Sequence, residues 1–171
     1  MYKKVAFLSM DSLENFYTYD KLLFEPLKTL DWIAEEISWR NETVNWSDFD
    51  AVVVRSTWDY QNDLSKFKNV LEKINSVSHL ENDIELMKWN MNKNYLFDLE
   101  QKGVRIVDTI WEKNFNSSKA HHYFDKLNTD EIIIKPNVSA SADNTFRLFK
   151  NNITEQLPIL EKIFAAREFM V

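Results

Sequence analysis

Three short apolar runs are spaced through the first third of the chain. Residues 4–9 (KVAFLS), 33–39 (IAEEISW) and 50–55 (DAVVVR) hold apolar positions between polar stretches, which predicts three strands. The continuous valine run of the third is typical of a parallel strand that is covered on both faces. We expect the first of the three to be the central strand of a sheet.

Two further stretches have helical periodicity. Residues 19–30 carry leucines three and four positions apart, and Pro26 among them predicts a helix that is kinked or starts late. Residues 64–74 (LSKFKNVLEKI) place their apolar side chains on one face and predict a helix that returns along the sheet. This alternation of strands and helices predicts an α/β fold, with a doubly wound parallel sheet in residues 1–85.

The chain changes character after residue 85, where we place a boundary between two domains. A helix predicted over residues 93–101 is expected to end at Gly103, because glycine readily adopts the left-handed conformation that follows a helix. Residues 104–107 (VRIV) predict a strand, and Ser117 is expected to cap the next helix. Residues 86–171 are therefore expected to form a smaller α+β unit.

The most informative stretch of this second part is residues 131–149 (EIIIKPNVSASADNTFRLF). Three consecutive isoleucines predict a strand buried on both faces, and Pro136 is expected to end it. After a loop of small and polar residues, residues 145–149 predict the partner strand of a long hairpin. A helix over about residues 154–166 and a strand over residues 167–171 complete the pattern.

Composition narrows the class of protein. The 171 residues include 21 Lys and Arg against 27 Asp and Glu, a formal net charge of −6, and no run rich in Lys or Arg. Nucleic acid and anionic membranes are therefore poor partners. The absence of cysteine excludes disulfides and thiolate metal sites and fits a cytoplasmic location. The first apolar run is too short for a signal peptide or a membrane span.

Glycine and histidine usage excludes several kinds of site. Gly103 is the one glycine, so neither a P-loop nor a GxGxxG fingerprint can be drawn, and a bound nucleotide would need lysines and a loop without glycine. His121 and His122 are adjacent, which sets them about 100° apart on a helix and prevents them from sharing a metal ion. We predict no metal site.

The first candidate site lies at the hairpin of residues 131–149. Lys135 stands at the exit of the predicted strand, and the loop that follows is long enough to fold over a ligand with its backbone N–H groups turned inward. We predict a lid over a phosphate group. The alternative is a lysine that ends a strand beside a solvated loop.

The second candidate site lies at the end of the predicted third strand. Arg55 can hold a carboxylate through two hydrogen bonds, Asp59 can accept from an amine, and Trp58 and Tyr60 can form the walls of a pocket. Asp11 follows the first strand, where open α/β sheets bind ligands. The alternative is that the two aromatic side chains pack at the domain edge and Arg55 pairs with a surface acid.

Four segments are informative when taken in order: RSTWDY at 55–60, KWNMNKNYL at 88–96, GVRIVDT at 103–109 and IIIKP at 132–136. Together they resemble the ATP-grasp superfamily, and within it the glutathione-synthetase-like carboxylate–amine ligases. The resemblance covers nearly the whole chain and implies a pre-ATP-grasp domain in residues 1–85 and part of an ATP-grasp domain, with the nucleotide lid, in residues 86–171.

The resemblance implies that ATP binds. Lys93 matches the first nucleotide lysine of the family and Lys135 the second, and residues 137–144 match the lid, with Ser and Ala where many relatives have glycine. Compact ammonium charges suit a reaction in which a γ-phosphoryl group passes to a carboxylate and an amine displaces the acyl phosphate. The implied substrate is an amino acid or a short peptide. The expected nucleotide-binding residues are Lys93, Lys135, Ser139, Ser141 and Thr145.

Family members continue into a second half that holds adenine and magnesium. The resemblance therefore implies magnesium with ligands outside residues 1–171, and these residues alone are expected to be catalytically inactive or nearly so. It also implies a possible homodimer. A competing interpretation is a non-catalytic module that binds a nucleotide or small molecule for regulation. A receiver-like phosphoacceptor domain is disfavoured, because the third strand ends in Arg55 and not in an aspartate.

Overall fold

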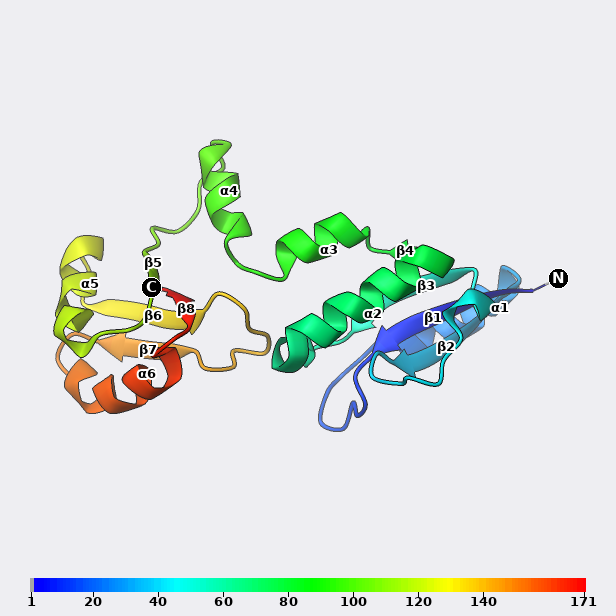
Figure 1. The fold of residues 1–171 in the computed structure, drawn as a ribbon, viewed down its shortest axis with the longest axis horizontal. Coiled ribbons are helices and arrows are strands. Elements are labelled where there is room, and N and C mark those ends of the chain that lie inside the picture. The colour runs from blue at the N-terminus through cyan, green and yellow to red at the C-terminus, as the bar shows by residue number, and fades with distance from the viewer. Residues whose placement is uncertain (1) are drawn as a thin grey trace. The chain divides into compact units, whose positions relative to one another are not determined.

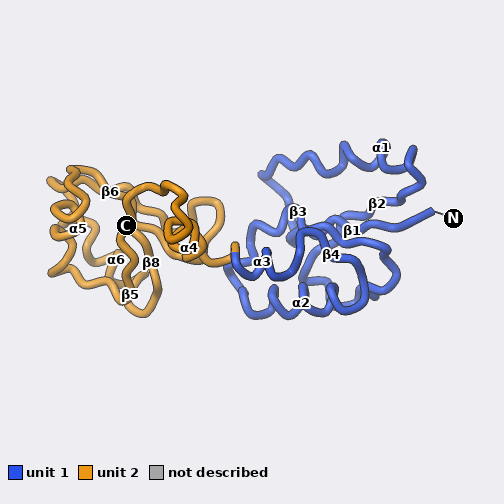
Figure 2. The backbone as a smooth tube through the Cα atoms, turned by 90° about the horizontal axis from the view of Figure 1, so that it is seen from above, with its two compact units in different colours: residues 1–89 blue, residues 90–171 orange. Residues whose placement is uncertain are grey.

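The computed structural model describes residues 2–171, which divide into two compact units (Figure 2). Unit 1 comprises residues 1–89 and unit 2 comprises residues 90–171. Each unit has a sheet of its own, and each is described by itself. Within residues 2–171, no helix has the length and apolar character needed to cross a bilayer.

Unit 1 is built on a four-stranded parallel sheet (Figure 1). The strand order is β2-β1-β3-β4, so the first strand of the chain is central, as predicted. Apolar residues of β1 and β3 fill the interior: Ala6, Leu8 and Val52 are fully buried. The sequence did not predict β4, which is only three residues long. The bounds are β1 Lys3–Ser9, β2 Trp32–Ser38, β3 Ala51–Ser56 and β4 His79–Glu81.

The helices of unit 1 cover both faces of its sheet, as Figure 2 shows for α1 (Phe24–Thr29) and α2 (Leu64–Val77). On the α1 side, the ring centroids of Phe7 and Phe24 lie 5.8 Å apart. On α2, Phe67, Leu71 and Ile74 are buried, and the Asp63 side chain caps the helix by accepting from the Lys66 N–H at 3.0 Å. The predicted doubly wound sheet is therefore confirmed. A short helix, α3 (Ile84–Asn90), follows.

Unit 2 contains a four-stranded antiparallel sheet with the order β5-β8-β6-β7. The core is packed between this sheet and two helices, with Tyr123 of α5, Phe164 of α6, Ile134 of β6 and Phe169 of β8 in one buried cluster. The expected α+β second part is confirmed. The bounds are β5 Trp111–Lys113, β6 Glu131–Pro136, β7 Phe146–Phe149, β8 Glu168–Met170, α4 Tyr95–Gln101, α5 Ala120–Leu127 and α6 Leu157–Phe164.

Strand β6 departs from the prediction in two ways. Ile132 and Ile134 are buried, but Ile133 between them is 47% exposed, so only one face of the strand is covered. The prediction of two buried faces was wrong because α5 and α6 both contribute to the core cluster on the Ile132 side. Pro136 does not end the pairing: it lies opposite Phe169 in β8, and the next residue, Asn137, donates its N–H to the Glu168 carbonyl at 3.2 Å.

Two local expectations in unit 2 were also wrong. Residues 104–107 form no strand, since the pairing partner of β8 begins later, at Trp111. The helix after residue 116 is capped by Asn116 and not by Ser117, because the Asn116 side chain accepts from the Ser118 N–H at 2.9 Å. Gly103 does follow α4 with a φ of 80°, as its expected left-handed role requires.

Candidate functional site

The root of the β6–β7 hairpin loop gathers three cationic side chains in unit 2. Lys135 belongs to β6, Arg167 directly precedes β8, and Lys93 lies two residues before α4. The Lys93 N–H donates to the carbonyl of Asn137, the first loop residue, at 2.8 Å. The approach to α4 and the start of the loop are therefore fixed to each other.

Two of these cations hold consecutive carbonyls of the loop. Lys93 Nζ donates to the Ser139 carbonyl at 2.9 Å and to Ser139 Oγ at 2.8 Å. Arg167 Nη2 donates to the Val138 carbonyl at 3.0 Å. Over residues 2–171, no carboxylate forms an ion pair with Lys93, Lys135 or Arg167. The described residues therefore provide no ion-pair partner for the three cations at the loop root.

The electrostatics of Lys93 reflect this excess of positive charge. Burial lowers the pKa of Lys93 below its usual 10.5, and the nearby charges of Lys135 and Arg167 lower that pKa further. An anion placed among the three cations would offset both effects, because it supplies the opposite charge that the ammonium group lacks. The loop root therefore has the charge of an anion-binding site.

The loop itself takes a backbone conformation that glycine adopts easily, although it contains no glycine. The φ angles of Ser141, Ala142 and Asn144 are 51°, 58° and 50°. A side chain with a Cβ is disfavoured in this left-handed region by roughly 1–2 kcal/mol per residue. Two backbone bonds close the turns: Asp143 N–H to the Ala140 carbonyl at 2.9 Å, and Thr145 N–H to the Ala142 carbonyl at 3.1 Å.

A cavity of about 390 Å³ lies beside the loop root in unit 2. Asn137, which is 4% exposed, donates through Nδ2 to Asn94 Oδ1 at 2.9 Å. Its Oδ1 atom is buried and has no hydrogen-bond partner among the residues that the structure describes. Asn137, which lines the cavity, therefore carries a buried acceptor that the described residues do not satisfy. The lining residues of the cavity are Asn94, Trp111, Glu112, Lys113, Asn137 and Glu168.

The structure brings together some of the predicted nucleotide residues. Lys93 contacts Ser139 directly, and the charge of Lys135 lies close enough to contribute to the lowered pKa of Lys93. Ser141 is exposed, and in the described part of the chain no hydrogen bond joins Ser141 or Thr145 to either lysine. Their nucleotide-binding role stays a prediction.

Arg167 was not among the predicted site residues. The sequence showed it only as the first residue of an expected strand, with no motif around it. Its position is set by the pairing of β8 with β6, which places residues 167 and 138 side by side although 29 positions separate them. The available signal was the position of Arg167 directly before a predicted strand, which could have paired with the strand that contains Lys135.

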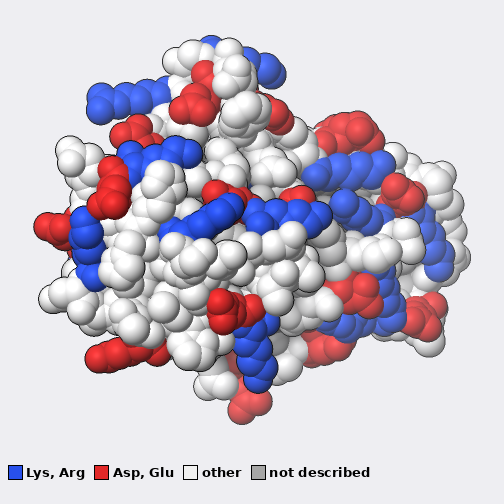
Figure 3. All heavy atoms as spheres, turned by 60° about the vertical axis from the view of Figure 1, so that its left-hand side comes forward, with Lys and Arg blue, Asp and Glu red and all other residues white. Residues whose placement is uncertain are grey.

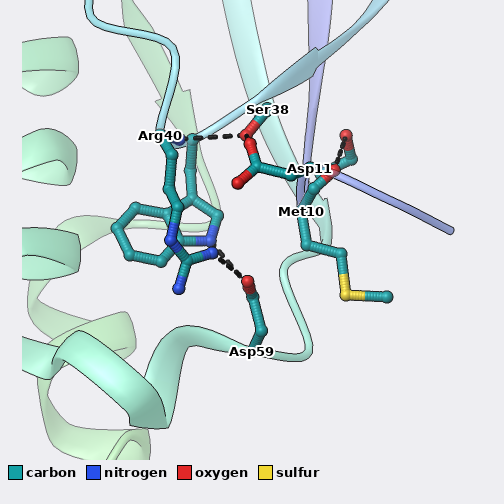
Figure 4. Close-up of polar contacts among 7 residues, drawn as sticks. Met10, Asp11, Ser38, Arg40 and Asp59 are labelled. Carbon is teal, nitrogen blue, oxygen red and sulfur yellow. Dashed lines mark hydrogen bonds and ion pairs between the residues drawn. The ribbon is translucent and has the colours of Figure 1, made fainter.

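The predicted substrate residues of unit 1 lie at strand ends, and two of them belong to one hydrogen-bond network (Figure 4). Asp11 accepts from Ser38 Oγ at 2.5 Å, and Ser38 Oγ accepts from the Arg40 N–H at 3.1 Å. The Arg40 guanidinium forms an ion pair with Asp59 and lies 3.9 Å from the centroid of the Trp39 ring. Trp39 Nε1 donates to Asp59 at 2.7 Å. Both oxygens of the Asp59 carboxylate therefore already accept from the protein.

Arg55 belongs to a second cluster. Its Nε and Nη2 atoms lie 2.8 Å and 2.7 Å from Oδ1 of Asp20, and Ser56 Oγ donates to Oδ2 of the same carboxylate at 2.6 Å. Asp20 is 2% exposed, whereas the Arg55 side chain remains 40% exposed. Arg55 therefore pairs with a buried acid and not with the surface acid of the alternative interpretation.

The two predicted aromatic wall residues contact other rings. The centroids of Trp58 and Phe16 lie 5.4 Å apart, and those of Tyr60 and Phe67 lie 5.6 Å apart. Both Trp58 and Tyr60 are half-buried. These ring contacts hold the Trp58 and Tyr60 side chains in place beyond the end of β3. Their role in substrate binding stays a prediction.

Comparison with known proteins places this geometry in context. Residues 5–82 match the family model described as D-cycloserine synthetase DcsG, N-terminal domain. The cycloserine biosynthesis protein DcsG of Streptomyces lavendulae is 36% identical over 87 residues, which are 51% of this chain and 29% of that protein.

Solved structures extend the likeness over both units. The crystal structure of D-cycloserine synthetase DcsG matches 98% of this chain with a TM-score of 0.83 and 24% identity. A RimK domain protein ATP-grasp from Sphaerobacter thermophilus matches 98% with a TM-score of 0.69 and 14% identity. The chain has the fold of the amino-terminal part of an ATP-grasp ligase. A third such structure, D-alanyl-alanine synthetase A from Vibrio cholerae, matches 99% with a TM-score of 0.71 and 13% identity.

The predicted ATP-grasp resemblance is thus confirmed at the level of the fold. The chain spans 58%, 62% and 58% of these three structures. The cationic loop root of unit 2 lies at the start of residues 137–144, for which the resemblance predicted the nucleotide lid, and that role stays a prediction.

Proposed function

We propose that the chain is the amino-terminal part of an ATP-dependent carboxylate–amine ligase and that its unit 2 binds the triphosphate of ATP between Lys93 and Lys135. The observation that carries this proposal is the group of three cations without an acidic partner at the root of the loop, on an ATP-grasp fold. A polyphosphate fits this group, because it supplies the negative charge that the site lacks.

The residues of the chain have distinct parts in this proposal. Lys93 and Lys135 neutralise the phosphate oxygens, and the left-handed loop after Asn137 turns backbone N–H groups toward the anion. Bound ATP supplies the γ-phosphoryl group that activates a carboxylate as an acyl phosphate. Magnesium, which such a transfer requires, takes its ligands from outside residues 1–171 in this proposal; within residues 2–171 no three His, Asp or Glu side chains are grouped to hold a metal ion.

The proposed substrate is amino-acid-like. Two of the similar proteins are named for cycloserine and for alanyl-alanine, both of which have an amino-acid skeleton. In unit 1, Arg55 keeps part of its guanidinium accessible while Asp20 fixes its direction, which suits a substrate carboxylate. Asp11 is exposed and suits an ammonium group. We further propose that Trp58, Asp59 and Tyr60 shape this region without directly providing the charge that binds the substrate.

The surface charge agrees with a small-molecule role. Figure 3 shows Lys and Arg side chains interspersed with Asp and Glu over the face that it presents, with no broad field of one sign. The formal net charge of −6 points the same way. A small, local cation group of this kind suits a nucleotide better than a polyanion that tracks along a surface.

The test is an assay of ATP turnover with magnesium and a panel of amino acids. Residues 1–171 and the same chain extended by any in-frame downstream coding sequence are compared, with hydroxylamine added to trap an activated carboxylate as a hydroxamate. We expect amino-acid-dependent ADP and hydroxamate from the extended chain, and their loss in Lys135→Ala but not in Lys126→Ala, which changes an exposed lysine of α5. ATP binding without turnover by the extended chain would support the non-catalytic module instead.

A further inference from the structure

We propose that Arg167 is a third cation of this anion site and a positioning residue of the loop: it holds the Val138 carbonyl and directs its remaining N–H groups toward a polyphosphate. This inference rests on the proposed nucleotide binding and adds a residue that neither the sequence motifs nor the matched segments assign.

The contacts of the loop root show how Arg167 is placed. Its Nη2 donates to the Val138 carbonyl at 3.0 Å, and Lys93 Nζ donates to the next carbonyl along, that of Ser139, at 2.9 Å. Both cationic groups therefore contact the first turn of the loop, and Arg167 lies near enough to Lys93 for its charge to lower the pKa of that ammonium group. Asn137 N–H, bonded to the Glu168 carbonyl at 3.2 Å, ties the same turn to the strand that Arg167 precedes.

Both cations retain donors for a ligand. A guanidinium carries five N–H groups and an ammonium carries three. Arg167 uses one of its five on Val138, and Lys93 uses two of its three on Ser139. The contacts to the loop therefore orient the two side chains and leave N–H donors available for a ligand. Lys135 adds a further ammonium group.

The arrangement also orders the loop before a ligand arrives. Charge-assisted hydrogen bonds hold the carbonyls of Val138 and Ser139 in place. The conformational entropy that is lost when a polyphosphate binds is therefore smaller, because this part of the loop is already ordered. Loss of Arg167 removes one of these anchors and one of the three charges. Its effect on anion binding should therefore exceed its effect on folding.

The experiment measures binding of sodium tripolyphosphate and of ATP to the full chain by isothermal titration calorimetry at low and at high ionic strength. Two variants separate charge from contact: Arg167→Gln keeps an N–H donor for Val138 but is neutral, and Arg167→Lys keeps the charge. Arg105→Gln is the matched control, because Arg105 is an exposed arginine of the same unit. Circular dichroism melting of each variant reports folding.

We expect Arg167→Gln to weaken tripolyphosphate binding roughly tenfold to a hundredfold, the size of a lost charge-assisted hydrogen bond. Arg167→Lys should recover most of the affinity, and Arg105→Gln should not change it. The difference between wild type and Arg167→Gln should shrink at high salt. If Arg167→Gln fails to fold, Arg167→Met, which keeps the aliphatic part of the side chain without its charge, takes its place. Weaker tripolyphosphate binding by Arg167→Met than by Arg167→Lys supports the inference, and equal binding by wild type and Arg167→Met overturns it.

The outcomes separate this inference from the proposed function. ATP and tripolyphosphate binding that is equally tight in wild type and Arg167→Gln would overturn the role of Arg167 and leave nucleotide binding between the lysines intact. ATP binding by wild type without any tripolyphosphate binding would also overturn the anion site. Failure of wild type to bind either ligand would overturn both proposals.

Discussion

Replacing Asp20 by asparagine tests how Arg55 is held in unit 1. The Asp20 carboxylate is 2% exposed and accepts hydrogen bonds from Arg55 Nε at 2.8 Å and from Ser56 Oγ at 2.6 Å, and its Oδ1 atom also forms an ion pair with Arg55 Nη2 at 2.7 Å. Asp20→Asn keeps the size of the side chain but removes its charge and replaces an acceptor with a donor. Ser56 and Arg55 then both face a group that cannot accept from all of them.

The size of the effect follows from these contacts. Removal of one partner from a fully buried ion pair costs about 3–5 kcal/mol. The Arg55 side chain is 40% exposed, so water can solvate part of the guanidinium in the variant. We therefore expect a smaller loss of about 2–3 kcal/mol in the free energy of unfolding, close to that of one or two hydrogen bonds to a charged group.

Urea unfolding followed by tryptophan fluorescence measures this loss, since five of the six tryptophans lie in unit 1. With a slope of about 2 kcal/mol per molar urea, the midpoint should fall by about 1–1.5 M. Asp48→Asn is the control, because Asp48 is exposed and its carboxylate accepts from the Asn45 side chain at 2.8 Å; its effect should stay within about 0.5 kcal/mol. An Asp20→Asn midpoint equal to that of the control would refute the anchoring of Arg55 by Asp20.

Three further predictions concern the other clusters. The pKa of Lys93 is lowered from 10.5, so its ammonium group loses its proton at a lower pH than an ordinary lysine does. ATP affinity should therefore fall as the pH rises, and the stability of the ligand-free protein should rise over the same pH window because Lys93 loses its unfavourable charge. Calorimetric and urea titrations of Lys93→Arg, which keeps its charge, should show neither change. Ala142→Gly, at a φ of 58°, should be neutral or stabilising by up to about 1 kcal/mol in urea unfolding, whereas Ala140→Gly, at a residue without positive φ, should cost about 0.5–1 kcal/mol. Asp59→Ala should cost about 1–3 kcal/mol, since it leaves the buried Trp39 indole N–H without its acceptor, and Asp59→Asn should cost less; equal effects of the two would contradict this explanation.

The local patterns of unit 1 were sufficient to predict its architecture. The valine run of β3 and the apolar face of α2 specify a strand covered on both sides and a helix that covers one of them. In unit 2 the same reasoning failed at Ile133, because three consecutive isoleucines are compatible with a buried strand and with one that has an open face. Only the placement of α5 and α6 decides between the two.

The candidate sites divide in the same way. Lys135 could be singled out because it lies near a recognisable strand exit, and Lys93 because the resemblance matched it to the first nucleotide lysine of the family. Asp20 and Arg167 could not, because their partners, Arg55 and Val138, are 35 and 29 positions away. The pairing of β8 with β6 brings Arg167 to Val138, and the short 3-10 helix that begins at Asp20 brings that carboxylate to Arg55 at the end of β3. Charge pairs made through tertiary contacts leave no local pattern in the sequence.

The central claim is that ATP binds between Lys93 and Lys135, and a thermal-shift titration with ATP tests it most directly. A ligand that binds only the folded state stabilises it by about 2.7 kcal/mol at a hundred times its dissociation constant, so the melting temperature of the wild-type chain should rise with ATP concentration. The rise should disappear in Lys93→Ala and in Lys135→Ala and persist in Lys126→Ala. An unchanged melting temperature in the wild type, or an equal rise in all four proteins, would contradict the account.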